Sequence, residues 1–337
     1  MELNVSNVLY FIASWLCGMG MAVVIAHNGE KMGLVDYPND RSSHDQPIPK
    51  GAGSGIALGF LVTALLINMN ILFCLPAMLI GLLGMISDRR EIAPGKRLVF
   101  QLLLALLFMT NFNAWPANFT LTIMLFLLLS VYIVGTTNIY NFMDGINGIA
   151  AITGIISFSF LGYFAWSKGA DDKLLLILYS VVVACLGFLP FNFPRAKVFM
   201  GDVGSTFLGF LFAGMVTYLT RDISDFIVLV SFLFPFYADE LTTMFVRFKD
   251  RENITKAHRR HLYQLLVNEG QMAHWKVTLA YGVLQVAVSL IALRLQRYGG
   301  VTLIIVLLTL FGVFTAASIF IRFKLTATRA NDAKERS

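Results

Sequence analysis

The most regularly spaced polar residues lie in the stretch NIYNFMDGINGIAA, residues 138–151, between two hydrophobic runs. Asn138, Asn141 and Asp144 recur at every third position, which places them within about 120° on one face of a helix. An uncompensated carboxylate in a bilayer costs roughly 2.5–3.5 kcal/mol, so a cavity, a metal ion or a cation must offset it. Because no Lys or Arg neighbours Asp144, a polar cavity at a helix end is favoured, with a simple helix cap as the alternative.

A second polar stretch, FNFPRAKVFMGDVGS, spans residues 191–205. Asn192 ends one apolar run, and Asp202 opens the next between two glycines. Glycines and the free N–H groups of a helix N-terminus suit an anionic ligand, whereas Asp202 would repel a bare phosphate. A divalent cation between them resolves this conflict, because Mg²⁺ usually takes one or two carboxylates together with phosphate oxygens.

Two shorter loops add charge. Asp88 and Glu91 lie among Lys and Arg side chains in residues 88–97, which an ordinary charged loop would also explain. Lys50 belongs to PKGAGSG, which resembles a flexible loop that approaches a phosphate, although this pattern is weak by itself.

The stretch AHRRHLYQLL places His258 and His261 one helical turn apart, with Arg259 and Arg260 between them. Two histidines at this spacing could bind a metal ion. The adjacent arginines favour the other interpretation, a clamp for a polyanion. The remaining histidines are expected to be structural or interfacial, and they are His27, His44 and His274.

The elements that position these residues are expected to be membrane helices. The 337 residues are 57% hydrophobic and 14% charged, with a mean hydropathy of +0.71. Soluble domains carry about 25% charged residues, so the composition indicates a polytopic membrane protein. At about 20 apolar residues per span, the chain predicts an all-α bundle of about eleven transmembrane helices. We expect them at 7–26, 52–69, 71–87, 98–113, 118–137, 147–166, 174–191, 203–220, 226–246, 276–296 and 301–321.

Basic residues predict the orientation. With the amino terminus outside, 21 of the 26 Lys and Arg residues face the cytoplasm, as the positive-inside rule requires. The net charge of +6 then reflects orientation, and nucleic-acid binding is not needed to explain it. The expected organisation is one transmembrane domain, residues 1–321, and a basic cytoplasmic tail, 322–337, that is frayed. The predicted cytoplasmic loops are 27–51, 88–97, 138–147, 191–205 and 247–275.

Together these loops supply carboxylates for Mg²⁺, cations for a pyrophosphate and carboxamides for a polar ligand, all beside apolar helices. Phosphoryl transfer depends mainly on positioning and charge neutralisation. The residues therefore predict the joining of a soluble phosphorylated molecule to a lipid phosphate.

At this point the motifs resemble those of the polyprenyl-phosphate N-acetylhexosamine-1-phosphate transferases, a family that includes the phospho-MurNAc-pentapeptide transferases. The likeness rests on PIPKGAGSG, SDRREIAPGKRLVFQ, NIYNFMDGING, NFPRAKVFMGDVGS and AHRRHLYQ. It implies transfer of a HexNAc-1-phosphate from a UDP-sugar to undecaprenyl phosphate, which releases UMP and requires Mg²⁺, with Mn²⁺ as an alternative. It also implies an enzyme of the bacterial inner membrane, surrounded by membrane lipids, whose active site faces the cytoplasm. Whether the enzyme forms a homodimer is left open.

The resemblance assigns roles to individual residues. It implies that Asp202, Asp144 and Asp88 are catalytic and bind the metal ion. The implied substrate-binding residues are Lys50, Asn138, Asn141, Asn147, Asn192, His258, Arg259, Arg260 and His261.

Two positions depart from the family pattern. The family usually has adjacent aspartates where this chain has Ser87 and Asp88, so a general base at the first position would be missing. A lipid phosphate is already largely ionised at neutral pH, and Asp88 is therefore assigned to the metal or the acceptor. Asn147 replaces an aspartate of many relatives, which suggests a subfamily with another sugar preference. YNFMDGINGIAA together with AHRRHLYQ resembles the branch that initiates O-antigen, where deoxy-HexNAc donors such as UDP-FucNAc or UDP-QuiNAc occur.

Two alternatives belong to other functional classes. A transporter or flippase for a nucleotide-sugar or lipid-linked sugar would also use broken helices and polar helix ends, but near mid-membrane and with internal repeats. A membrane scaffold without chemistry would be a degenerate relative in which Ser87 marks lost activity.

Overall fold

The structure is a computed structural model, and it describes residues 5–38, 42–90, 92–111, 118–253 and 258–335, with side chains described to residue 325. Glu91 and the side chains of the basic tail beyond that residue lie outside the described part. The elements are α1 (Val5–Asn28), β1 (Val35–Asp36), β2 (Ile48–Pro49), α2 (Ser54–Leu66), α3 (Ile71–Arg89), α4 (Pro94–Met109), α5 (Phe119–Phe142), α6 (Ile149–Ser167), α7 (Asp172–Asn192), α8 (Gly201–Leu219), α9 (Ile223–Ser231), α10 (Phe234–Lys249), α11 (Leu262–Asn268), α12 (His274–Leu295), the 3₁₀ helix η1 (Gln296–Tyr298) and α13 (Gly300–Glu335).

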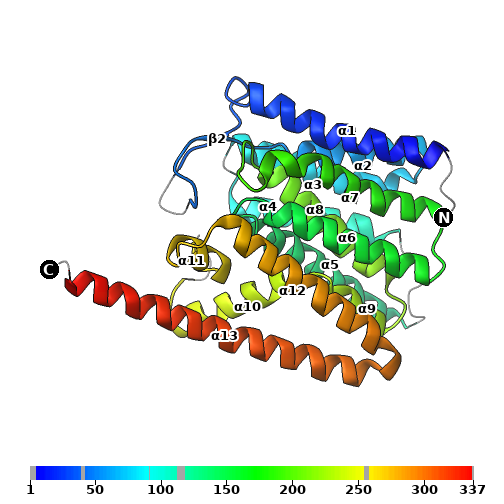
Figure 1. The fold of residues 1–337 in the computed structure, drawn as a ribbon. Helices are drawn as coiled ribbons and strands as arrows, with labels where there is room; N and C mark the ends of the chain where they lie inside the picture. The colour runs from blue at the N-terminus through cyan, green and yellow to red at the C-terminus, as the bar shows by residue number, and fades with distance from the viewer. Residues whose placement is uncertain (1–4, 39–41, 91, 112–117, 254–257, 336–337) are drawn as a thin grey trace.

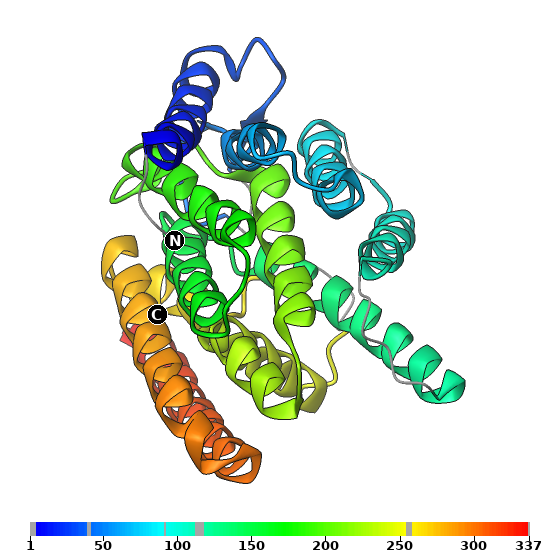
Figure 2. The ribbon, with the colours of Figure 1, turned by 90° about the vertical axis from the view of Figure 1, so that its right-hand side faces the viewer.

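The helices run side by side, with β2, α11 and the C-terminus at one end and the N-terminus at the other (Figure 1). Helix α8 is the centre of this bundle. Of its apolar 18-residue stretch, 89% is buried, and the helix packs against α3 and α5 (Figure 2). By contrast, only 6% of the corresponding stretch of α13 is buried. Apolar side chains that cover an outer helix in this way suit a lipid environment, which confirms the prediction of an all-α polytopic membrane protein.

Fewer helices are long enough to cross a membrane than the sequence predicts. Eight helices in the described part are long and apolar enough to cross a membrane, and the pair α9 and α10 would be a ninth. Helices α2 and α4 have 13 and 16 residues, which is short for a bilayer core of about 30 Å. The predicted division between 52–69 and 71–87 is present, because the Asn70 side chain caps α3 by accepting from the Leu72 N–H. The count of eleven stays a prediction.

The predicted helix 226–246 is two helices, α9 and α10, that meet at an angle of 84°. Pro235 lies in the first turn of α10, where it cannot donate to the preceding turn, so a continuous helix is interrupted there. The break frees the carbonyl of Phe232, and Gln285 on α12 donates to it at 2.7 Å. Backbone groups freed within a membrane domain need such partners.

Replacing Gln285 by leucine is expected to destabilise the protein. The Phe232 carbonyl would lose its partner while remaining buried, which costs about 1–3 kcal/mol. Thermal unfolding in detergent measures the effect, and Gln271→Leu, at an exposed position, is the control. An unchanged melting temperature for Gln285→Leu would show that the break does not need this bond.

The expectation of a frayed tail after residue 321 is wrong, because α13 continues to Glu335. The segment contains no Gly or Pro after Gly312 and is rich in Ala, Lys and Arg, which are good helix formers. Arg322 also anchors this part of α13 by donating to Thr243 Oγ1 on α10 at 2.8 Å.

Candidate active site

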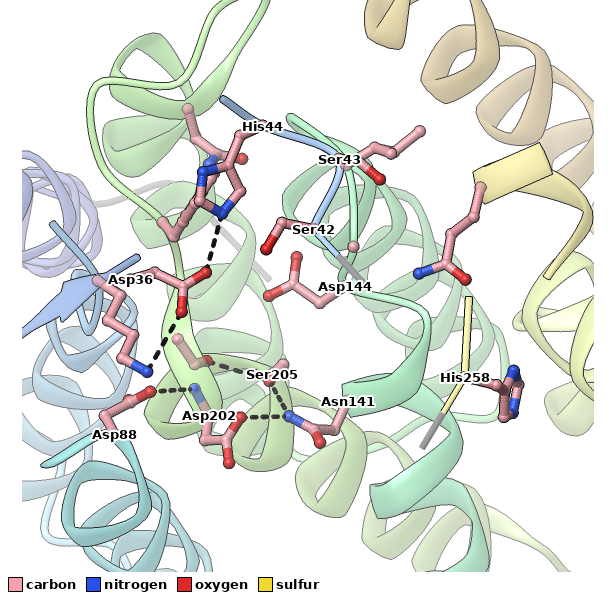
Figure 3. Close-up of a pocket in the computed structure, with 17 residues that line it drawn as sticks. Asp36, Ser42, Ser43, His44, Asp88, Asn141, Asp144, Asp202, Ser205 and His258 are labelled. Atoms are coloured by element: carbon pink, nitrogen blue, oxygen red, sulfur yellow. Dashed lines mark hydrogen bonds and ion pairs between the residues drawn. The ribbon is translucent and has the colours of Figure 1, made fainter. Parts of the chain in front are cut away.

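One cavity of about 340 Å³ lies at the end of the bundle that carries β2 and α11, and all five predicted loops contribute to its wall (Figure 3). Among the described residues, the lining includes Asp36, Ser42, Ser43, His44, Lys50, Asp88, Asn141, Asp144, Asn192, Asp202, Ser205, His258 and Gln264. Asp88, Asp144 and Asp202 therefore come from three separate parts of the chain into one cavity.

Asp88 caps helix α8. Its Oδ1 accepts from the Asp202 N–H at 3.0 Å, and its Oδ2 accepts from the Val203 N–H at 3.1 Å. A carboxylate at a helix N-terminus is stabilised by the free N–H groups and by the helix dipole. The expectation that the start of α8 offers free N–H donors to a phosphate is therefore wrong for these two groups, because Asp88 already occupies them.

The cap requires a glycine at position 201. Gly201 has a φ of +75°, and a Cβ there would lie 2.6 Å from Asp88 Oδ2 and 2.7 Å from the Gly51 nitrogen. The backbone of the Lys50 loop packs against the start of α8 in the same place. Its Ala52 and Gly53 N–H groups donate to the carbonyls of Phe199 and Met200, so these two groups are not free to bind a phosphate.

Asp202 points into the cavity and has two side-chain partners. Asn141 donates to Asp202 Oδ1 at 2.9 Å (Figure 3). Arg97 Nη1 lies 3.4 Å from Asp202 Oδ2. Asn141 also donates to Ser205 Oγ at 2.9 Å, one turn further along α8. Arg97 and Ser205 were not predicted as site residues, since nothing in their own loops indicates a pairing across the bundle.

Asp144 lies in the turn between α5 and α6 and lines the same cavity. Burial, together with the negative charges of Asp202 and Asp88, raises the pKa of Asp144 to about 7. Carboxylates held close together in a partly buried site resist full ionisation without a cation. This is the electrostatic setting that a bound cation or a cationic ligand would relieve.

Lys50 lines the same cavity and brings a positive charge near Asp88. Its Nζ lies 3.6 Å from Asp36 Oδ1, and His44 Nε2 lies 3.0 Å from Asp36 Oδ2. Register between β1 and β2 pairs Asp36 with Ile48, which brings it beside Lys50. His44, expected to be structural or interfacial, instead lines the cavity, and Asp36 was missed because only the strand pairing brings it there.

The histidine loop contributes one of its four predicted residues to the wall. His258 lines the cavity, across from Asp88 and Asp36 (Figure 3). Burial and the neighbouring His261 and Arg247 lower the pKa of His258 to about 4, so it is neutral at pH 7. His258 therefore acts there as a hydrogen-bonding group and does not contribute positive charge.

The other three residues of that loop are outside the cavity wall and engaged elsewhere. Arg260 pairs with Asp250 at 2.6 Å and also with Glu252, and Arg259 lies 3.8 Å from Glu269. His261 is buried 3.4 Å from Glu240 Oε2. In this structure the adjacent cations secure the loop itself, so the expected polyanion clamp is not formed by them.

Two of the predicted asparagines, Asn141 and Asn192, line the cavity, whereas Asn138 and Asn147 lie outside its lining. Asn138 donates to Gln101 Oε1 at 2.7 Å and accepts from Arg97 at 3.2 Å. Asn192 accepts from the Gly148 N–H at 2.7 Å and reaches the cavity wall. Asn147 lies outside the cavity lining, where its side chain donates to the Pro194 carbonyl at 3.3 Å.

The carboxylates suit a divalent metal ion only if a ligand completes its coordination. In the described part of the chain, no group of three His, Cys, Asp or Glu side chains is placed to hold an ion alone. Both Asp88 oxygens already accept backbone bonds, and Asp36 pairs with Lys50 and His44, which leaves Asp202 and Asp144 as the lining carboxylates that could bind the ion. Two carboxylates with phosphate and water oxygens are the donor set that Mg²⁺ commonly uses.

The fold and the cavity define a multi-pass membrane protein with a polar cavity, lined by several carboxylates, at one end of its helix bundle. The profile of glycosyl transferase family 4 matches residues 70–220, which contain Asp88, Asp144 and Asp202. Over these residues the chain is similar to this family.

Named relatives extend the likeness over most of the chain. A probable undecaprenyl-phosphate N-acetylglucosaminyl 1-phosphate transferase of Bacillus subtilis is 27% identical over 83% of this chain and 82% of the relative. A decaprenyl-phosphate N-acetylglucosaminephosphotransferase of Mycobacterium leprae is 29% identical over 78% and 76% of the two chains. A phospho-N-acetylmuramoyl-pentapeptide-transferase of Streptococcus pneumoniae is 32% identical over 49% of this chain and 54% of its own.

Proposed function

We propose that the protein transfers a HexNAc-1-phosphate from a UDP-sugar to undecaprenyl phosphate, yielding undecaprenyl-diphosphate-sugar and UMP. The observation that carries the proposal is the meeting of Asp202, Asp144 and Lys50 in one cavity at a membrane helix end. These side chains match the charges of a pyrophosphate bound through a metal ion. The names of the relatives support the same class of donor and acceptor.

In the proposed reaction, an oxygen of the lipid phosphate attacks the β-phosphorus of the donor. The bond from that phosphorus to the oxygen shared with the α-phosphate breaks, and UMP leaves with that oxygen. The second pKa of a phosphate monoester is about 6, so the attacking oxygen is largely ionised at pH 7 and no general base is required. Positioning and charge neutralisation then supply the catalysis.

The chain's own residues have distinct roles in this scheme. Asp202 and Asp144 would hold Mg²⁺, which when bound neutralises the pyrophosphate and the charge that develops on UMP. Lys50 pairs with a phosphate oxygen, and Asn141 fixes the Asp202 side chain. Asp88 positions Asp202 by holding the start of α8. Mn²⁺ has the same preference for oxygen ligands and is expected to substitute.

An apolar groove between α4 and α5 supports a lipid acceptor. It has a volume of about 530 Å³ and is lined by Leu98, Leu102, Val131, Val134 and other apolar residues. Arg97 and Asn138 also line it, and Arg97 contacts Asp202. A polyprenyl chain in this groove would bring its phosphate to Arg97, beside the carboxylates.

The test is UMP release by the purified protein with undecaprenyl phosphate, Mg²⁺ and a panel of UDP-HexNAc donors. We infer that the preferred donor is a deoxy-HexNAc nucleotide such as UDP-FucNAc or UDP-QuiNAc, as in the initiation of O-antigen. We also infer that the protein lies in a bacterial inner membrane, with the cavity facing the cytoplasm. Absence of UMP with every donor, while UMP still binds, would contradict the transfer reaction. The transporter alternative has less support, because Asp88 and Asp202 lie at helix ends.

Replacing Ser87 by aspartate is expected to be tolerated, with a change in rate of less than about threefold. The family pattern has adjacent aspartates at this place, so the position is expected to accept the added carboxylate, and no hydrogen bond of Ser87 Oγ is lost. The rate of UMP release at saturating donor measures the effect. A large gain in rate would mean that the missing carboxylate limits this enzyme and that a base at this position matters.

A further inference from the structure

The cavity wall contains one buried polar atom without a partner. Several described side-chain atoms are buried and lack a hydrogen-bond partner. Of these, only Gln264 Oε1 belongs to a residue that lines the cavity. The Gln264 side chain is 8% exposed. A buried amide oxygen without a bond costs about 1–3 kcal/mol, and such groups in native proteins commonly mark a ligand contact or a functional site.

Helix α11 holds Gln264 firmly in this position. Buried Asp239 on α10 accepts from the Leu262 and Tyr263 N–H groups at 2.7 and 3.1 Å, which caps the helix. Tyr281 on α12 donates to the same carboxylate at 2.7 Å. Because these contacts fix the backbone directly before Gln264, and its side chain is buried, the position of the carboxamide is set by the fold.

The same helix packs directly on the turn that carries Asp144. Tyr263 donates to the Phe142 carbonyl at 3.0 Å. A Cβ on Gly145 would lie 2.2 Å from Tyr263 Oη and 3.2 Å from Gln264 Nε2. Only a glycine at position 145 admits this approach, so the carboxamide lies against the Asp144 turn.

The loop of Ser42 and Ser43 forms the neighbouring wall. Ser43 Oγ accepts from Asn268 on α11 at 3.1 Å, which joins the two walls. Figure 3 shows Ser42 and Ser43 on the Asp144 side of the cavity, away from Asp88. This region is uncharged apart from Asp144, unlike the part of the cavity around Asp202, Lys50 and Arg97.

We propose that the Gln264 carboxamide binds an amide group of the nucleotide-sugar donor, one that presents an N–H beside a C=O. A carboxamide supplies an acceptor and a donor side by side, and such a group pairs with both. The donor contains this chemistry in two places, the imide edge of uracil and the N-acyl group of the hexosamine. Gln264 is thereby a specificity-determining residue, and this inference rests on the proposed function.

The experiment measures binding of three ligands to the full-length protein in detergent with Mg²⁺. The ligands are UMP, UDP-glucose and UDP-GlcNAc, and the variant is Gln264→Met, which keeps the length of the side chain but removes both hydrogen-bonding groups. If Gln264 contacts the N-acyl group, UDP-GlcNAc binding weakens about ten- to hundredfold while the other two ligands are unaffected. If it contacts uracil, all three weaken by the same factor. Either pattern supports the inference.

Unchanged affinity for all three ligands in Gln264→Met would overturn it. The control is Gln271→Met, the same substitution at an exposed position beyond α11, which should leave all three affinities unchanged. Melting temperatures are recorded, and binding is measured well below them, so that unfolding is not mistaken for lost recognition. Should Gln264→Met fail to fold, Gln264→Asn withdraws the carboxamide by one methylene, and the same patterns are expected. Failure of the wild-type protein to bind UMP would instead contradict the proposed function.

Discussion

Asp202→Asn is expected to abolish UMP release, with a loss of about 10³-fold. The substitution keeps the shape of the side chain and removes the negative charge that faces the cavity. In the structure this carboxylate accepts from Asn141 at 2.9 Å and pairs with Arg97 at 3.4 Å, so its position is set from α5 and α4. The loss should appear in the rate at saturating donor, and raising Mg²⁺ should restore part of it, because a metal ligand has been weakened.

The control for this variant is Asp171→Asn at the opposite end of the bundle. Asp171 caps α7 by accepting from the Lys173 N–H, and asparagine caps a helix equally well. UMP release from membranes that contain undecaprenyl phosphate measures both variants. Turnover of Asp202→Asn within about threefold of the wild type would remove Asp202 from the proposed reaction.

Gly201→Ala is expected to have the next largest effect. Alanine at a φ of +75° is strained by about 1–2 kcal/mol, and its methyl group would also overlap Asp88 Oδ2 and the Gly51 nitrogen. Forcing such an overlap in a packed site costs about 1–3 kcal/mol more. The Asp88 cap and the Lys50 loop would have to separate from α8, and a misplacement of about 1 Å can lower activity about 100-fold.

Gly169→Ala separates these two causes. Gly169 has a φ of +71°, but a Cβ there meets no atom within 4 Å. This variant should therefore show only the backbone strain, as a modest drop in melting temperature with normal UMP release. Equal losses of activity in the two variants would mean that the close contact at Gly201 has no functional role.

Local features of the sequence were enough to locate the membrane helices and the loops between them. Hydropathy is a property of consecutive residues, so the apolar runs correspond to helices throughout the described part, including the division at Asn70. The one expected helix that is broken contains Pro235, a signal present in the sequence but outweighed by the length of the apolar run. Seven polar residues that were expected at the site also line the cavity: Lys50, Asp88, Asn141, Asp144, Asn192, Asp202 and His258.

The sequence by itself determined which segments are apolar and which loops carry the acids, because these properties belong to each segment alone. Only the tertiary structure decided which residues of these loops form hydrogen bonds and ion pairs with one another. Asp88 turns to cap α8, Arg97 reaches Asp202, Asp36 joins Lys50, and the cations beside His258 pair within their own loop. Each pairing joins residues whose distance depends on how helices pack, and a hydrogen bond is specific to within tenths of an ångström. The unpaired amide oxygen of Gln264 is visible for the same reason, since its lack of a partner exists only once every neighbour is in place.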